Sequence, residues 1–141
     1  MKQLFRSLFC FFIIVSSLTL HADTPLEGKM SKMKGTFKEL SKSLQAPVEA
    51  DKAKYVQLAT QLRDLMKESR ELTPEKTDEI PAEKRAEFVQ GYQKQIDQSI
   101  ALLETMIQTL EASNWPEAQK QFDLLKQYQK EGHKAYRAEH P

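Results

Sequence analysis

Two side chains able to bind iron stand near opposite ends of this sequence, a methionine at position 30 and a histidine at position 133. A thioether and an imidazole together form the axial ligand pair of many electron-transfer haems, and methionine raises the reduction potential relative to a second histidine. When both axial positions are filled, oxygen and peroxide have no open site, so such an iron can only change its oxidation state. Met30 and His133 therefore predict iron ligation wherever a fold brings them together.

Cysteine usage restricts how a haem could be attached. The single cysteine, Cys10, lies in an N-terminal apolar run, and residues 23–141 contain none. Iron–sulfur ligation, thiol catalysis and covalent haem attachment through a C-x-x-C-H motif all require cysteine. We therefore exclude these three chemistries for residues 23–141, and any haem must be held non-covalently.

The N-terminal residues have the pattern of an export signal. Two basic residues precede the apolar run LFCFFIIVSSLTL, and a cleavage point follows between Ala22 and Asp23. The run is shorter than the ~20 residues that span a bilayer. We predict a cleavable signal peptide at residues 1–22, one domain at residues 23–141, and a periplasmic protein with no stable membrane insertion. An uncleaved anchor is the alternative, because Leu20 is larger than the residue preferred at a cleavage site.

The charge of the predicted domain argues against two classes of partner. Removing residues 1–22 from the 141-residue chain leaves 119 residues, with 19 basic and 20 acidic side chains. Charges of both signs alternate along the chain, whereas nucleic-acid binding requires a basic stripe. A cationic amphipathic membrane binder would likewise need an excess of lysine and arginine. We expect no nucleic-acid partner.

Apolar residues recur at steps of three and four in four segments, which is the spacing of one helix face. Each segment is bounded by capping residues or proline. We expect helices from Pro25 to before Pro47, from about Asp51 to Glu71, from near Ala82, and after the cap Asn114, with a loop at residues 73–81. Their apolar faces are Leu26, Met30, Met33, Phe37, Leu40 and Leu44; Leu58, Leu62, Leu65 and Leu72; Phe88, Tyr92, Leu103, Met106 and Leu110; and Ala118, Phe122, Leu125, Gln129, His133 and Tyr136.

Four amphipathic helices with short connections predict an all-α fold, an antiparallel up-down-up-down four-helix bundle. In that topology the start of the first helix and the end of the fourth meet at one end. Met30 is about five residues into its helix, ~8 Å along the axis, and His133 is four to eight residues from the end of its helix, ~6–12 Å along. Both should therefore reach a similar depth.

A porphyrin also needs apolar walls, and Phe37, Phe88 and Tyr92 are predicted at about the right level. Simpler interpretations stay open on spacing alone. Methionines on an apolar stripe are common gap-filling core residues, and a histidine near a helix C-terminus can interact with the helix dipole.

An ordered set of short matches resembles the cytochrome b562 family over essentially all of residues 23–137. Leu26-Glu27-Gly28-Lys29-Met30 resembles the Leu-Glu-x-x-Met segment that supplies that family's methionine ligand. His133 followed by Tyr136 and Arg137 resembles the segment with its histidine ligand, and Glu117-Ala118-Gln119 stands at the family's distance before it. Thr73-Pro74 matches the second inter-helix loop. Phe88 and Gly91, with Tyr92 in place of phenylalanine, match the start of the third helix. The resemblance implies one non-covalent b-type haem.

The sequence departs from the family pattern close to the predicted histidine ligand. Gln129 stands where the better-known family member has arginine, which removes one candidate partner for a haem propionate. Gly132 replaces a bulky aromatic residue, and glycine inside a helix costs ~1 kcal/mol relative to alanine. Arg137 remains the best candidate for a propionate contact because of its planar charged fork. Met33, one turn after Met30, is the fallback sulfur ligand.

The leading expectation is therefore a periplasmic electron-transfer haemoprotein that is not an enzyme. Its iron ligands would be Met30 and His133, and its haem contacts would also include Met33, Phe37, Phe88, Tyr92 and Arg137. Its partners would be redox proteins that the sequence does not identify. The alternative is a haem-free helical module that binds a protein partner or a metal ion, with His133 and His140 as candidate ligands.

Overall fold

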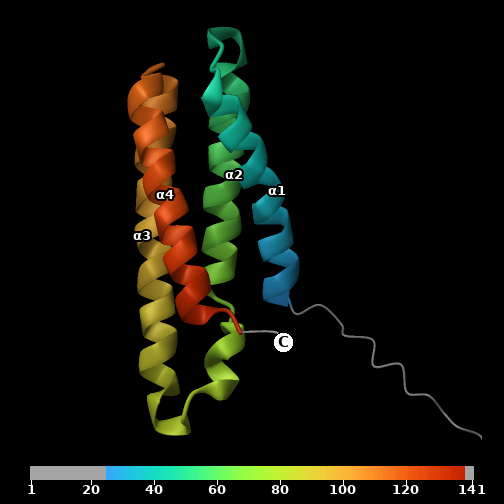
Figure 1. Ribbon diagram of the computed structural model, residues 1–141, viewed down its shortest axis with the longest axis vertical. Helices are drawn as coiled ribbons and strands as arrows, with labels where there is room; N and C mark the ends of the chain where they lie inside the picture. Colours follow the sequence, from blue (N-terminus) through green and yellow to red (C-terminus); the bar gives the residue numbers. More distant parts are fainter. Residues whose placement is uncertain (1–24, 139–141) are drawn as a thin grey trace, which may run out of the picture.

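The computed structural model describes residues 25–138, which form an up-down-up-down four-helix bundle (Figure 1). The helices are α1 (Pro25–Gln45), α2 (Lys52–Arg70), α3 (Arg85–Glu111) and α4 (Trp115–Tyr136). Helices that follow one another in the chain pack extensively together, α2 and α3 most of all, whereas α1 and α4 touch far less. The predicted fold class is confirmed. The predicted signal peptide, Cys10 and His140 lie outside the described residues.

Local sequence signals explain where the helices begin and end. The Asn114 side chain accepts a hydrogen bond from the Glu117 amide at 3.4 Å, which satisfies one of the amides left free at a helix N-terminus. Pro116 occupies the first turn of α4, where its missing N–H costs nothing. Before this cap, Ser113 has a φ of 56°, and this left-handed residue reverses the chain between α3 and α4.

Three short 3-10 helices refine the predicted boundaries. They are η1 (Glu49–Asp51), η2 (Glu75–Glu79) and η3 (Ala82–Lys84), so the segment predicted as a loop is partly helical, and α3 begins three residues later than predicted. The fourth helix is also shorter than expected. Arg137 is extended at φ −87° and ψ 133°, and its amide donates to the His133 carbonyl at 3.1 Å. His133 consequently lies three residues from the helix end.

The fully buried core is concentrated in one half of the bundle. This closed half contains the α1–α2 and α3–α4 connections and the neighbouring helix turns. The ring of Phe37 packs against that of Phe122, a member of this core, with the ring centroids 4.7 Å apart. Its buried members are Leu40, Leu44, Tyr55, Leu58, Ala59, Leu62, Leu103, Met106, Leu110, Ala118, Phe122 and Leu125. The closed half supplies most of the hydrophobic stabilisation, because that term scales with the apolar area removed from water.

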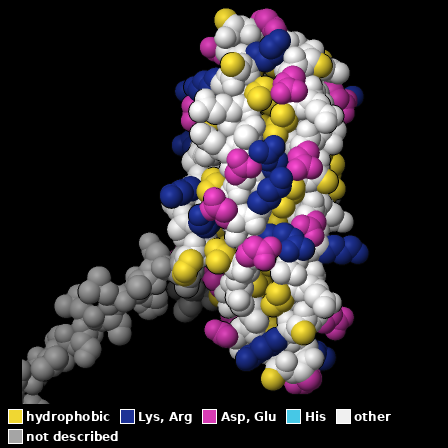
Figure 2. Space-filling model, turned by 180° about the vertical axis from the view of Figure 1, so that it is seen from behind, with side chains coloured by type: hydrophobic (Ala, Val, Ile, Leu, Met, Phe, Trp, Pro, Cys, Tyr) yellow, Lys and Arg dark blue, Asp and Glu magenta, His cyan; other side chains and the backbone are white. Residues whose placement is uncertain are grey.

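The surface carries mixed charges. Figure 2 shows acidic and basic side chains next to each other along one face, with hydrophobic side chains between them. Between α2 and α3, Arg70 binds Asp97 at 2.6 Å and Lys67 binds Glu104 at 3.0 Å. Such exposed pairs contribute at most about 1 kcal/mol each. Within residues 25–138, no helix is long and apolar enough to cross a membrane.

Candidate haem site

The predicted ligands lie in the other half of the bundle, where several apolar side chains are only half-buried. This open half contains the start of α1, the end of α2, the start of α3 and the end of α4, which Figure 1 shows at the same end of the molecule. Along α1, Leu26, Leu40 and Leu44 are buried, but the residues between them on the same stripe, Met30 and Met33, are only half-buried. The stripe therefore loses its cover at the predicted sulfur ligand.

Met30 lies in the second turn of α1 and directly follows Lys29 in the chain. An ion pair between Lys29 and Glu68 ties this part of α1 to the end of α2. Helix α1 also packs far more extensively on α2 than on α4. The start of α1 is thus held mainly from the α2 side, which leaves the half-buried thioether of Met30 less covered than the leucines of the same stripe.

His133 lies in the last turn of α4, and its side chain is exposed overall although part of the ring faces protein. Partial burial of the imidazole is the largest cause that lowers its pKa, and the cationic Arg137 lowers it further. The carboxylate of Glu75 acts in the opposite direction. The net effect favours the neutral imidazole, which is the form that binds a metal.

The predicted aromatic residues of α3 are engaged with the end of α4. The ring of Phe88 lies 5.1 Å from that of Tyr136, and the Tyr92 ring lies 5.5 Å from it. The buried Tyr92 hydroxyl donates to the Ser69 carbonyl on α2 at 2.7 Å. These contacts hold the last turn of α4, and with it His133, against α3. Both rings contact Tyr136, which was not among the predicted haem contacts.

Gly91 permits this close approach of α4. A Cβ atom at Gly91 would lie 2.9 Å from the Tyr136 hydroxyl, closer than side chains normally tolerate. Gly132, the sequence departure next to His133, lies beside the Gln95 side chain instead, and a Cβ there would meet it at 3.4 Å. Gln95 in turn donates to the Tyr128 carbonyl at 3.1 Å. The helix at Gly132 is therefore supported from α3.

The connection between α2 and α3 contributes a residue that the sequence did not single out. The 3-10 helix η2 packs against α4, and Glu75 at its start carries a buried carboxylate oxygen, Oε2, with no hydrogen-bond partner among the described residues. A glutamate in a charged, proline-containing loop has no distinguishing pattern. Only the packing of the loop on α4 reveals its position near His133.

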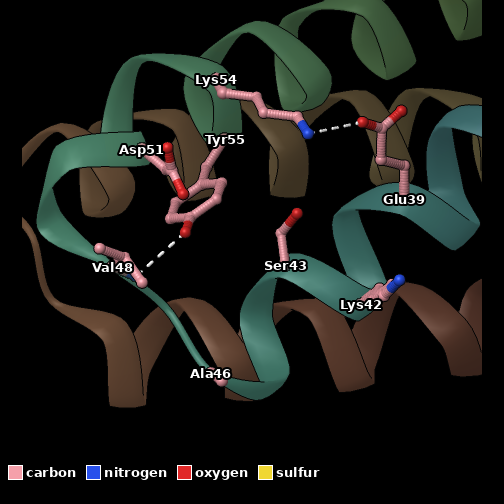
Figure 3. A pocket seen from close by; sticks show the side chains of 8 residues that line it. All are labelled: Glu39, Lys42, Ser43, Ala46, Val48, Asp51, Lys54 and Tyr55. Carbon is pink, nitrogen blue, oxygen red and sulfur yellow. Dashed lines mark hydrogen bonds and ion pairs between the residues drawn. The ribbon is translucent and has the colours of Figure 1, made fainter.

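A hollow lies at the other end of the bundle, at the α1–α2 turn (Figure 3). Its lining includes an ion pair between Lys54 and Glu39 at 2.8 Å. The Val48 amide donates to the Tyr55 hydroxyl at 3.0 Å across the turn. These groups satisfy one another, and none of the predicted ligands is among the lining residues.

The residues of the open half fit a haem in their donor chemistry. A thioether and an imidazole, the axial pair expected from the sequence, lie on α1 and α4, which pack against each other only weakly. Apolar side chains that the fold leaves half-buried could cover a porphyrin; they are Met30, Met33, Phe37, Leu65 and Met66. Arg137 is exposed next to the imidazole and carries a charge complementary to a propionate. Within residues 25–138, no group of three or more His, Cys, Asp or Glu side chains is placed to hold a metal ion.

The fold and the donor pair define a class, the four-helix bundles with potential axial ligands on their first and last helices. Comparison with known families identifies the group within that class. The model of the family described as cytochrome b562 matches residues 25–137. The chain therefore belongs to the cytochrome b562 family, whose members are haem-binding electron carriers. A search of curated proteins found no match to this chain.

Proposed function

We propose that this protein is a periplasmic electron carrier that binds one non-covalent b-type haem, with Met30 and His133 as the axial ligands. The observation that carries the proposal is the placement of both donors in the open half of the bundle, on helices α1 and α4. When bound, the haem supplies a one-electron change of its iron. The family match supports haem binding and electron transfer as the function.

The protein residues would each contribute in a distinct way. Met30 would supply a soft sulfur ligand, which favours the reduced iron, while the neutral imidazole of His133 would supply the other ligand. Met33 and Phe37, half-buried on α1, would exclude water from the ring. Arg137 would pair with a propionate, and Phe88 and Tyr92 would hold the end of α4 through Tyr136.

The location and the partners belong to the same proposal. The N-terminal pattern of residues 1–22 predicts export to the periplasm, where redox proteins would exchange electrons with the haem. The mixed surface charges fit brief encounters of this kind better than tight binding to a strongly charged partner.

The proposal is tested by absorption spectra of the protein expressed with its own N-terminal segment. The reduced protein should show sharp low-spin b-type bands, and acid–organic extraction should remove all the haem. His133→Ala should abolish stable haem binding, and Met30→Ala should leave a weaker, five-coordinate or water-ligated haem.

Met33→Ala is the matched control, because it removes a sulfur one turn away on the same half-buried stripe and should change the spectrum little. If the His133 and Met30 variants both kept the wild-type low-spin spectrum, the ligand assignment would be wrong. A protein that stays colourless with added haemin would instead favour a haem-free binding module.

A further inference from the structure

Glu75 has a carboxylate that is incompletely satisfied by the fold. Its Oε2 atom is buried and lacks a hydrogen-bond partner within residues 25–138. A buried polar atom without a partner costs roughly 1–3 kcal/mol, and most buried polar atoms in folded proteins do have a partner. The other acidic residues of η2, Asp78 and Glu79, are exposed and carry no such cost.

The carboxylate lies within electrostatic reach of the proposed histidine ligand. Helix η2 packs on α4, and the negative charge of Glu75 acts on the His133 ring in opposition to the positive charge of Arg137. Among residues 25–138, the charges that act on the imidazole are those of Glu75, from η2, and Arg137, from the end of α4 itself.

An imidazole that ligates iron through one nitrogen carries a proton on the other. That N–H almost always donates to a carboxylate, a carbonyl or water, and the acceptor fixes both the tautomer and the orientation of the ring. The Oε2 atom of Glu75 lacks a donor, and the outer N–H of a ligating His133 requires an acceptor. A hydrogen bond between them would satisfy both groups.

We propose that Glu75 is a positioning residue that accepts a hydrogen bond from the His133 ring nitrogen not bound to iron. This inference rests on the proposed function, because it requires His133 to be a ligand. The hydrogen bond to a carboxylate increases the basicity of the imidazole. A more basic imidazole and a nearby negative charge both favour ferric over ferrous iron. Glu75 therefore lowers the reduction potential that methionine ligation raises.

The test compares Glu75→Gln and Glu75→Ala with Glu79→Gln, a control that removes an exposed carboxylate from the same 3-10 helix. Haemin affinity and reduction potential are measured for each purified holoprotein. Loss of an outer-shell partner typically costs about 10- to 100-fold in metal affinity. If ferric affinity falls about tenfold more than ferrous affinity, the potential rises by about 59 mV. We expect this rise in both Glu75 variants and none in Glu79→Gln. Because the unpartnered Oε2 destabilises the haem-free protein, haem-free Glu75→Ala should melt at no lower temperature than haem-free wild type.

A second measurement uses only the wild-type protein, so it does not depend on whether a variant folds. In the reduced, diamagnetic wild-type protein, the His133 ring N–H should exchange with solvent slowly, as expected for a proton held by a buried acceptor. Fast exchange of this proton would overturn the proposal. Potentials of the Glu75 variants equal to those of wild type and Glu79→Gln would overturn it as well, while haem binding by His133 would stand. A wild-type protein that binds no haemin would overturn both the function and this role.

Discussion

The phenol of Tyr92 links α3 to α2 inside the open half, and its removal gives a prediction with a worked magnitude. The side chain is 3% exposed, and its hydroxyl donates to the Ser69 carbonyl at 2.7 Å. The Leu72 amide also donates to that carbonyl, at 3.1 Å. Because Ser69 keeps this partner in Tyr92→Phe, the substitution should cost only the net hydrogen-bond term, about 1 kcal/mol at about pH 8.

The same residue makes stability depend on high pH. Burial raises the pKa of Tyr92 to about 12, compared with the usual value of 10.0. The folded state thus holds its proton more tightly than the unfolded state, so this stabilisation is complete below about pH 10 and is lost as the pH rises from about 10 to about 12. Each pKa unit corresponds to about 1.4 kcal/mol, so about 1.4 kcal/mol is lost by about pH 11.

The two effects together predict that the stability curves converge. Wild type should be about 1 kcal/mol more stable than Tyr92→Phe at about pH 8. This difference in the free energy of unfolding should vanish or reverse at about pH 11. Urea unfolding followed by circular dichroism at several pH values measures this difference directly. Tyr128→Phe is the control, because its half-buried ring lies on α4 and no hydrogen bond of its hydroxyl occurs within residues 25–138. A gap between wild type and Tyr92→Phe that stays constant over this pH range would refute the reasoning.

Three further experiments test the packing and the haem site. Gly35→Ala should stabilise the protein by about 0.5–1 kcal/mol, because a Cβ there meets nothing within 4 Å. Gly91→Ala should not stabilise it, because its Cβ must displace the Tyr136 side chain. Equal gains in stability in urea unfolding would contradict this reasoning. Phe122→Ala should cost about 3–5 kcal/mol, since the ring is fully buried, and a loss below about 1.5 kcal/mol would show that the core collapses around the site. Haemin at about 1,000 times its Kd should add about 4 kcal/mol of stability, so an unchanged melting temperature in calorimetry would count against the haem site.

The four helices and the chemistry available to them could be predicted from the sequence alone. Apolar residues at helical spacing, with Pro47 and Asn114 as boundary signals, predicted all four helices, and short connections predicted their up-down order. The absence of cysteine from residues 23–141 was sufficient to exclude covalent haem attachment through thioether bonds. These properties are local, because they depend on side chains a few residues apart or on residue type alone.

Tertiary packing, in contrast, determines which parts of each apolar stripe are covered. Leu40 and Met33 share one face of α1, yet only Leu40 is fully buried, because burial depends on how closely the neighbouring helices approach at each level. The spacing of residues gives the direction of a side chain but not the separation of two helices. The same limit applies to Glu75: its position near His133 arises from the packing of η2 on α4, which connects residues far apart in the sequence.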